Sequence, residues 1–453
     1  MSSHSPTEPA ANTTAKPSLK QTISWAFYDW ANTGYAMIVL ALLFPNLYNS
    51  VYAMDLSDAE QTAWFGRTLS ISSLIVAVLA PFLGSIGELG GLRKRLLLFF
   101  CSVGVVATAS CYFLLHGDYQ LASLIYIVGT VSFYSSNIFY DSMLATVSTP
   151  AKRHFVSGMG FSFGYSAGFI LLGITFVITL NPEKYGFADG FAASRVMYLV
   201  AACWWALFTL PLALNIKEQP KPNRPSVWAM ITEGATDTWA TFKEVIAIKP
   251  ILWFLLAYLF YIDGVNTIIM TAMNYGTTIG FEKEKIFIAF FVVQIFGVPC
   301  AILFGWIGGK IGPRKMIFIA IVIYLGVTAV GATIQPEPFK LFGITMSEMY
   351  VLAALIGMVQ GGIQALSRSY FTSLIPTGRE VSFFGFYSMI GKSAAVMGPW
   401  LMGSVALWFN NPEDPTFSTR LGMGSVALLF IIGAAFLAVA GHYDKRKRAK
   451  LAA

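Results

Sequence analysis

The chain has 453 residues, of which 56% are hydrophobic and only 12% are charged, and its formal net charge at pH 7 is +7. This composition excludes an ordinary water-soluble domain, in which about 25% of residues are charged. Apolar runs of about 20 residues recur from one end of the chain to the other, and each is long enough to cross a bilayer. The sequence therefore predicts an all-α membrane protein.

We expect about twelve transmembrane helices, six on each side of a polar linker that contains Pro220, Pro222 and Pro225. The predicted spans are 20–48, 62–86, 94–115, 119–147, 154–180, 192–215, 250–276, 285–308, 314–334, 347–374, 380–409 and 417–441. The predicted domains are a disordered cytoplasmic tail, an N-terminal six-helix bundle, a cytoplasmic linker, a C-terminal six-helix bundle and a basic cytoplasmic tail, at 1–19, 20–215, 216–249, 250–441 and 442–453.

Charge outside the spans predicts the orientation. Most of the 30 Lys and Arg residues fall on the face that carries both termini and the linker. Cytoplasmic loops carry an excess of these residues, so both termini are expected in the cytoplasm. The run Lys445–Arg448 is expected to lie against anionic headgroups. The first apolar run is too long for the core of a cleavable signal peptide.

Several site classes are not expected. The cysteines Cys101, Cys111, Cys203 and Cys300 fall within apolar spans without metal-like spacing, and the four histidines are scattered. The glycine-rich turns lack the Gly-Lys-Ser/Thr ending of phosphate loops and follow membrane spans rather than strands. We expect no metal site, no cofactor and no nucleic-acid partner, since topology already explains the positive charge.

Two internal similarities indicate a duplicated chain. The segment 84–94, Gly-Ser-Ile-Gly-Glu-Leu-Gly-Gly-Leu-Arg-Lys, matches 305–315, Gly-Trp-Ile-Gly-Gly-Lys-Ile-Gly-Pro-Arg-Lys, at a constant offset of 221 residues. Asp-x-x-Asn-Thr occurs both at 29–33 in the first span and at 263–267 in the seventh. Spans one to four therefore match spans seven to ten, which predicts a parallel six-helix repeat.

Ionisable residues inside apolar spans indicate a polar cavity, because each costs roughly 2.5 kcal/mol or more in a bilayer core unless it is paired or solvated. Amides accompany them at helical spacing, as in span ten, where Gln360, Gln364 and Arg368 recur every four residues. The predicted substrate-binding or coupling residues are Asp29, Asn32, Asn137, Asp141, Asp263, Asn266, Gln360, Gln364, Arg368 and Lys392.

These residue types suit the handling of a small polar solute. Amides supply neutral donors and acceptors, an arginine grips a carboxylate with two parallel bonds, and a buried aspartate loads and releases a proton. Structural readings stay open. Asp29 can form an interfacial or inter-helix structural bond, and Asp141 can form a structural ion pair with the other half of the chain. Arg368 can snorkel towards the cytoplasm, and Lys392 can bind substrate or only neutralise an acid.

The glycine-rich repeat resembles the loop of the major facilitator superfamily, a Gly-x-x-x-Asp-x-x-Gly-Arg-Lys pattern between spans two and three with a degenerate copy between spans eight and nine. Glu88 replaces the usual Asp, Leu89 a usual Arg and Gly309 the acid of the second copy, so a weakened gate pairing is expected. The resemblance implies a fold of two pseudo-symmetric six-helix bundles whose spans 1, 4, 7 and 10 line the cavity. The expected gate residues are Gly84, Gly87, Glu88, Gly91, Arg93, Gly305, Gly308, Gly312 and Arg314.

The opening segment 24–32, Ser-Trp-Ala-Phe-Tyr-Asp-Trp-Ala-Asn, is similar to fungal vacuolar amino-acid effluxers linked to autophagy and to their bacterial members. The expected protein is a monomeric secondary active transporter that moves an amino acid or similar metabolite by alternating access. Intramembrane acids favour proton coupling over sodium. A bacterial plasma membrane is a better expectation than a vacuolar one.

Other functions remain open at this point. Exporters of siderophores, nucleosides, sugars or drug-like compounds share the scaffold, as does a non-transporting receptor. An enzyme is not expected, since no metal-ligand pair or nucleophile–base motif is evident.

Overall fold

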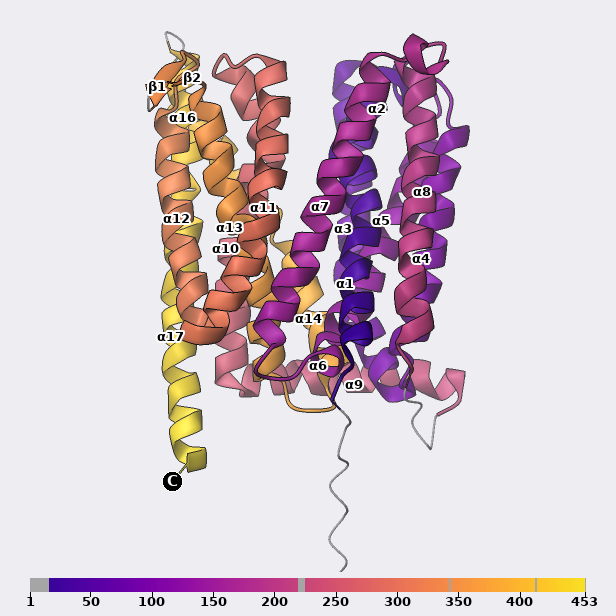
Figure 1. Ribbon diagram of the computed structural model, residues 1–453, viewed down its shortest axis with the longest axis vertical. Coiled ribbons are helices and arrows are strands. Elements are labelled where there is room, and N and C mark those ends of the chain that lie inside the picture. Colours follow the sequence, from indigo (N-terminus) through magenta and orange to yellow (C-terminus); the bar gives the residue numbers. More distant parts are fainter. Residues whose placement is uncertain (1–15, 219–224, 342–343, 412–413, 453) are drawn as a thin grey trace, which may run out of the picture.

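The structure is a computed structural model that describes residues 16–218, 225–341, 344–411 and 414–452. Long helices stand side by side, and one shorter helix, α9, lies across the end of the bundle where α1 begins and α17 ends (Figure 1). We call this end the terminal face and the other end the opposite face. The elements, with π-helical η1 and η2 and 3₁₀-helical η3 and η4, are α1 (Leu19–Thr33), η1 (Gly34–Leu43), α2 (Phe44–Leu47), η2 (Tyr48–Tyr52), α3 (Asp58–Gly90), α4 (Arg93–Ser110), η3 (Cys111–Phe113), α5 (Tyr119–Ser142), α6 (Leu144–Val147), α7 (Arg153–Leu180), η4 (Glu183–Tyr185), α8 (Gly190–Asn215), α9 (Val227–Ala247), α10 (Lys249–Thr278), α11 (Lys283–Ile311), α12 (Pro313–Thr333), β1 (Phe339–Leu341), β2 (Ile344–Met346), α13 (Glu348–Leu374), α14 (Glu380–Ser393), α15 (Met397–Trp408), α16 (Pro415–Ser425) and α17 (Ala427–Ala452).

The prediction of an all-helical membrane fold is confirmed. Within the described residues, eleven helical segments are long and apolar enough to cross a bilayer. The single helix predicted over 380–409 is wrong, because α14 and α15 are separate helices. Pro399 lies in the first turn of α15, where its missing N–H breaks no helical bond but where a continuous helix would lose one.

Three further features differ from the expected elements. The linker predicted over 216–249 contains a 21-residue helix, α9, which is capped by Ser226, whose hydroxyl accepts from the Ala229 N–H. Helix α17 continues through the predicted basic tail. Strands β1 and β2 form a short antiparallel hairpin at the opposite face, with Phe339 paired to Met346 (Figure 1). The tail predicted to be disordered lies, over residues 1–15, outside the described residues.

The helices that precede and follow the linker gather on two sides. Figure 1 shows α1 to α8 on one side and α10 to α17 on the other. Buried apolar side chains form two clusters, one centred on Trp25, Tyr35 and Trp205 and the other on Tyr261 and Phe371. Each side thus has its own core, while the domain boundaries drawn from the sequence stay predictions.

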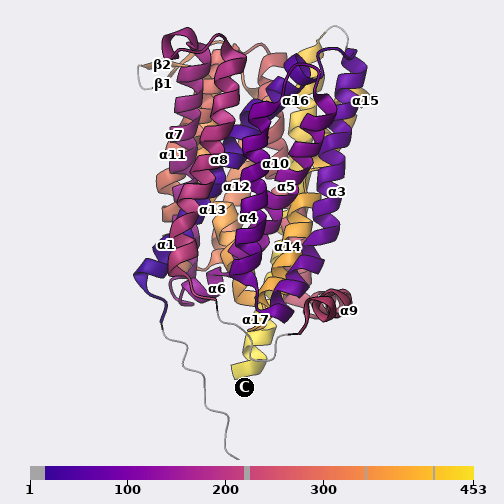
Figure 2. The same cartoon turned by 90° about the vertical axis from the view of Figure 1, so that its right-hand side faces the viewer.

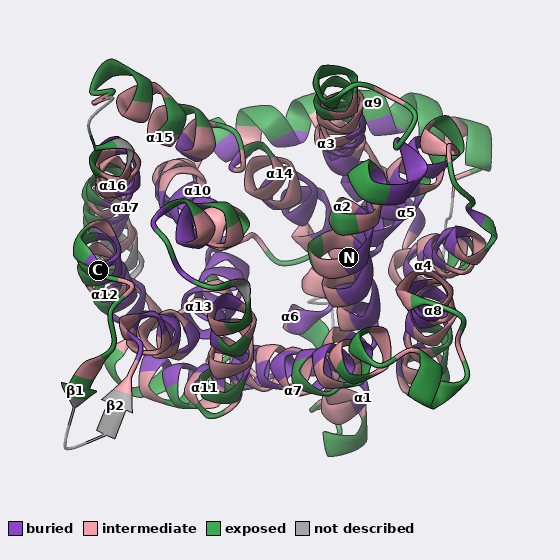
Figure 3. Cartoon of the chain, turned by 90° about the horizontal axis from the view of Figure 1, so that it is seen from above, coloured by how far each residue is buried: buried purple, intermediate pink, exposed green. Residues whose placement is uncertain are grey.

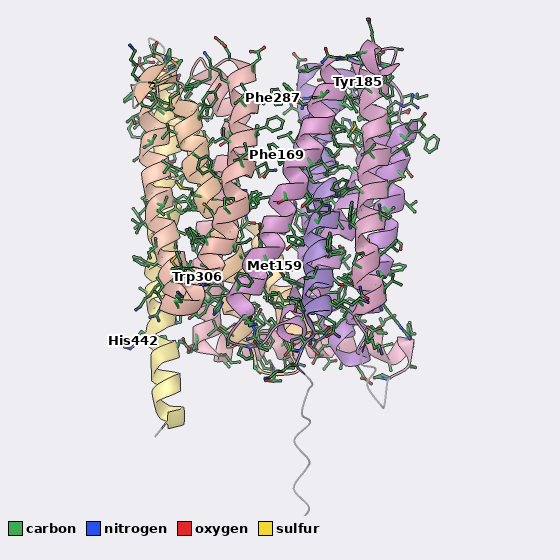
Figure 4. The ribbon with its side chains drawn as sticks, viewed as in Figure 1. Met159, Phe169, Tyr185, Phe287, Trp306 and His442 are labelled. Carbon is green, nitrogen blue, oxygen red and sulfur yellow. The ribbon has the colours of Figure 1, made fainter. Side chains whose placement is uncertain are left out.

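Small residues let the two sides approach at the terminal face. A Cβ at Gly385 on α14 would lie 2.5 Å from the Ala80 carbonyl oxygen on α3, and one at Gly305 on α11 would lie 2.6 Å from the His154 carbonyl oxygen on α7. Such spacing allows helix backbones to pack closely inside a membrane. Towards the opposite face the contact between α7 and α11 is aromatic, and Figure 4 shows Phe169 and Phe287 there.

We expect Gly385→Ala to destabilise the protein by about 1–3 kcal/mol, because the added methyl group overpacks against backbone. Gly403→Ala on α15 is the matched control, since nothing lies within 4 Å of its added Cβ. The control should leave the melting temperature unchanged or raised, as alanine favours helix. Thermal unfolding of both purified variants in detergent checks this. Equal melting temperatures would contradict the close-approach account.

Candidate functional site

A polar cavity of about 420 Å³ lies between the two sides of the molecule. Helices α1, α5, α7, α10, α11, α13 and α14 contribute its walls. Nine of the ten residues predicted for substrate binding or coupling line it, namely Asp29, Asn32, Asn137, Asp141, Asn266, Gln360, Gln364, Arg368 and Lys392. Helical spacing in the sequence therefore identified the faces that turn inward. The volume is that of a small-molecule site.

An ion-paired arginine forms the end of this cavity nearer the terminal face. The Arg368 side chain is only 3% exposed, and its Nη1 lies 3.0 Å from Asp141 Oδ1 while its Nη2 lies 3.3 Å from Asp29 Oδ2. Arg368 is on α13, whereas the two carboxylates come from α1 and α5. One guanidinium thus joins helices from both sides of the linker. We call this cluster the floor.

The remaining donors of Arg368 are also occupied. Its Nε donates to Ser157 Oγ and its Nη2 to the Ser157 carbonyl oxygen, both at 3.0 Å. The Tyr140 hydroxyl donates to Asp29 Oδ2 at 2.7 Å. The guanidinium carbon lies 4.8 Å from the Trp25 ring centroid and 4.5 Å from that of Phe161. A buried charge is tolerated only with such partners, so Arg368 has no donor left for a solute in this state.

The walls above the floor carry neutral amides and one further cation. Asn32 donates to Asn137 at 2.9 Å, which joins α1 to α5. Gln360 Oε1 is buried and has no hydrogen-bond partner within the described residues. The Lys392 ammonium lies 4.3 Å from the Tyr134 ring centroid and forms no salt bridge among the described side chains. The cavity therefore offers a cation that no described carboxylate neutralises.

Sequence reasoning missed several lining residues. Gln294 on α11 and Thr33 on α1 contribute polar atoms, and aromatic walls come from Tyr134, Tyr165, Tyr258 and Tyr387. A signal existed for Gln294, since it is an amide in an otherwise apolar span. The tyrosines gave no such signal, because aromatic residues are frequent throughout this chain.

The structure does not bring Asp263 to the cavity. Its side chain is fully buried, and Oδ2 accepts a hydrogen bond at 3.0 Å from the Gly398 N–H in the first turn of α15. The first N–H groups of a helix have no partner within the helix. Because span eleven breaks before α15, the Gly398 N–H is such a group, and Asp263 accepts its hydrogen bond. Oδ1 has no hydrogen-bond partner among the described residues. The coupling role expected for Asp263 stays a prediction.

A second ion-paired cluster joins the sides at the terminal face. Arg93 Nη2 lies 3.1 Å from Glu88 Oε1 and 2.8 Å from Glu380 Oε2. Glu88 Oε2 also accepts from the Val381 N–H at 2.7 Å. We call this cluster the latch. Glu88 is thus paired within this loop and to the start of α14, while the expected weakening of the gate pairing stays a prediction.

The other expected gate residues lie at the ends of α3, α4, α11 and α12 on this face. A Cβ at Gly84 would lie 2.7 Å from the Val381 carbonyl oxygen, and Gly91 adopts a left-handed conformation with φ 57° after α3. In the second loop Gly309 has open space where an acid is usual. That loop pairs no residue across the linker through a described salt bridge. The residues concerned are Gly84, Gly87, Gly91, Gly305, Gly308, Gly312 and Arg314.

The hydrogen bonds that join the two sides therefore cluster at the terminal face. The floor and the latch provide most of them, and His154 Nδ1 adds a contact of 2.9 Å to Ser369 Oγ. Polar side chains enclosed between two helical groups, closed at one face, are the arrangement expected of a membrane transporter.

Solved structures and sequence relatives agree with this class. The human organic anion transporter MFSD10 aligns with a TM-score of 0.65 at 14% identity, over 92% of this chain and 99% of that one. The major facilitator transporter FucP in its outward conformation aligns with a TM-score of 0.66 at 13% identity, over 93% and 97%. At this identity the likeness establishes the fold alone, which is the fold of the major facilitator transporters.

The family follows from sequence. Residues 57–450 match the family described as vacuole effluxer Atg22 like. An uncharacterized MFS-type transporter, YxiO of Bacillus subtilis, is 34% identical over 422 residues, covering 92% of this chain and 94% of YxiO. Autophagy-related protein 22 of Yarrowia lipolytica is 26% identical over 419 residues, covering 75% and 70%. The chain belongs to the Atg22-like family of major facilitator transporters and is a multi-pass integral membrane protein.

We expect Asp263→Asn to leave the melting temperature close to that of the wild type, because the amide oxygen can still accept from the Gly398 N–H. Asp263→Ala should cost about 1–3 kcal/mol, since it leaves that buried N–H without a partner. Thermal unfolding in detergent measures both. An alanine variant as stable as the asparagine variant would show that Asp263 does not cap α15.

Proposed function

We propose that the protein is a secondary active transporter that moves an amino acid, or a similar small zwitterion, by alternating access and with proton coupling. The terminal face is cytoplasmic in this proposal, in keeping with the excess of Lys and Arg there. The chain is proposed to act as a monomer, in a bacterial plasma membrane. The coarse class, a transporter with a solute substrate, already follows from the family.

The floor is the observation that carries the proposal. Arg368 forms ion pairs with Asp29 and Asp141, which precede the linker, and in this proposal the three side chains separate the cavity from the cytoplasm. Removing one partner of a buried ion pair costs about 3–5 kcal/mol. Opening towards the cytoplasm must therefore exchange these contacts for others. A proton on one of the two carboxylates would lower the cost of breaking these contacts.

The cavity supports a zwitterion better than a fully apolar solute. Lys392 is a cation without a salt-bridge partner in the described chain, and it suits a carboxylate. Asn266 and Gln364 also line the cavity, and a side-chain amide oxygen suits an ammonium. This assignment moves the solute carboxylate from Arg368, where sequence reasoning put it, to Lys392. Arg368 is occupied by its own carboxylates in this conformation.

Proton coupling has a direct physical route through the floor. A proton that enters from the cavity and neutralises Asp29 or Asp141 removes one of the two negative charges next to Arg368. The attraction across the floor then falls, which favours opening towards the cytoplasm. A proton bound on the cavity side is thus released on the cytoplasmic side. Symport and antiport differ only in which conformation prefers the solute.

We expect Lys392→Ala to weaken amino-acid binding about tenfold, which corresponds to about 1.4 kcal/mol. Lys310→Ala is the matched control, because Lys310 also contacts an aromatic ring, at 3.5 Å from the Trp306 centroid, but does not line the cavity. The twenty amino acids are first screened by thermal shift, and titration of the one that stabilises most gives the affinity. If both variants bind as the wild type does, Lys392 does not hold the solute.

The same screen tests the substrate class. Stabilisation by one or more amino acids supports the proposal, and transport of that amino acid into proteoliposomes completes it. Stabilisation only by sugars, nucleosides, siderophores or drug-like compounds would redirect the assignment to one of those exporters. Binding without any flux would indicate a receptor on the same scaffold.

We expect Asp29→Asn and Asp141→Asn to abolish uptake driven by an inward proton gradient, while exchange of labelled for unlabelled solute continues. Neither amide can carry the proton, yet both keep an acceptor for Arg368. Glu183→Gln, an exposed carboxylate at the opposite face, is the control. Pyranine trapped inside the proteoliposomes reports the protons. Coupled proton uptake at the wild-type rate in both aspartate variants would remove the floor from the coupling route.

A further inference from the structure

Helix α9 presents an apolar face that the described part of the protein covers only in part, at Phe242, which contacts Phe386. Its exposed large apolar residues are spaced by one, three, eight, three and four positions, so they share one side of the helix. Trp228 is 75% exposed and Trp239 is 59% exposed. The members of this face are Val227, Trp228, Ile231, Trp239, Phe242 and Ile246. We call it the aromatic face of α9.

The two other sides of α9 have different characters. One side, with Met230, Gly234, Thr241 and Val245, is buried against the bundle. The other is exposed and polar, with Thr232, Glu233, Thr236 and Lys243. A helix with a protein side, an apolar side and a polar side fits a position where protein, lipid and water meet. A helix that lay wholly in water would expose two tryptophans at a cost.

Contacts with α3 fix the depth of α9 in the membrane. A Cβ at Gly234 would lie 3.0 Å from the Ile86 side chain, and the Thr238 hydroxyl donates to Ser85 Oγ at 3.1 Å. These residues precede the bases Arg93, Lys94 and Arg95, which begin α4 and belong among lipid headgroups. Because α9 contacts α3 before those bases, it lies at the boundary between headgroups and acyl chains.

The views of the fold agree with this depth. Figures 1 and 2 show α9 perpendicular to the membrane-spanning helices at the terminal face. Seen from above, α9 runs along the outside of the bundle, beyond α3 and α14 (Figure 3). No other described helix lies on the outer side of α9 in this view.

We propose that the aromatic face of α9 is a lipid-binding surface, inserted into the bilayer leaflet at the terminal face, and that this insertion stabilises the conformation closed at that face. The occupant is the acyl and glycerol region of bilayer lipid. Large aromatic side chains and a polar opposite side are typical of helices that lie in this interface. The surface is separate from the solute cavity.

The second part of the proposal rests on how α9 is joined to the closed face. Arg379, in the turn before α14, lies 2.8 Å from Asp237 Oδ1 and donates to Thr241 Oγ1 at 2.6 Å. The Phe242 ring stacks on that of Phe386 at 6.2 Å between centroids. Helix α9 thus holds α14 on one side and α3 on the other. These two helices also carry Glu380 and Glu88 of the latch.

Lipid contact would therefore act on the transport cycle from outside the cavity. When the aromatic face is seated, α9 keeps α3 and α14 together and the latch closed. When the face is lifted or the lipid packing is altered, that constraint weakens. This inference rests on the proposed function only for its two conformations, open and closed at the terminal face. The experiments that test it measure spin-label accessibility and spin-label distances, and neither requires a solute.

The location is tested by nitroxide labels in proteoliposomes of phosphatidylcholine and phosphatidylglycerol. The background replaces only the two cysteines that are not buried, Cys203 and Cys300, by alanine. Trp239→Cys tests the aromatic face and Thr236→Cys, on the polar side of the same helix, is the control. We expect the label at 239 to be several-fold more accessible to oxygen than to a water-soluble nickel chelate, and the label at 236 to show the reverse. Higher nickel accessibility at both positions, or exclusion of both reagents at 239 by a protein neighbour, would overturn the proposal.

The effect on conformation is tested by spin labels at Lys152→Cys and Lys315→Cys, two exposed positions on the terminal face from opposite sides of the linker. In lipid nanodiscs, Trp228→Ser with Trp239→Ser should raise the fraction of long distances at least threefold. Thr232→Ser with Thr236→Ser, two changes on the polar side, should leave the distribution unchanged. An unaltered distribution in the tryptophan variant would show that lipid contact does not hold the closed state. Folding of each variant is checked independently by its melting temperature.

Discussion

The structure depends on one buried guanidinium. Arg368 lies in an apolar helical bundle, where an uncompensated charge is not sustainable, and the chain compensates it with two carboxylates, a serine and a ring of aromatic side chains. These partners come from helices on the far side of the linker. The electrostatic requirement of one residue therefore decides how the two sides of the molecule meet, and where the cavity ends.

The other contacts at the terminal face follow from this closure. The glycines that bring α3 against α14 and α7 against α11 permit the approach, and the latch adds a second ion-paired cluster nearer the surface. Helix α9 then ties the same two helices from outside through Arg379. Charge, backbone proximity and a surface helix thus favour the same conformation. Each can be altered separately, which is what allows their contributions to be measured apart.

Asp29 and Asp263 illustrate how a duplicated sequence diverges in use. Both occur in an Asp-x-x-Asn-Thr segment, and both following asparagines line the cavity. Asp29 is part of the floor, whereas Asp263 accepts a hydrogen bond from the Gly398 N–H in the first turn of α15. The difference arises because the second copy faces a broken helix with unsatisfied N–H groups. A repeat preserves residue types, but the neighbouring helices decide what each carboxylate satisfies.

The inward faces of the helices could be predicted because an α-helix has a fixed period. Gln360, Gln364 and Arg368 are four residues apart and must share a side, and the same holds for Asn137 and Asp141. The partner of a buried charge could not be predicted in this way. Nothing in the spacing along α13 says that Arg368 meets Asp29 and Asp141 rather than a solute, since that depends on how separate helices are placed. The same limit applied to Asp263, whose partner is exposed only because span eleven breaks.

The sequence by itself therefore determined the membrane class, the extent of most spans and the polar faces, because composition and helical period are local properties. It also indicated the family through short segments such as 24–32. Only the tertiary structure decided that Arg368 closes the cavity, that Lys392 is left without a salt-bridge partner in the described chain, and that the linker helix lies against α3 and α14. These are relations between residues far apart in the chain, and packing and electrostatic compensation set them rather than local pattern.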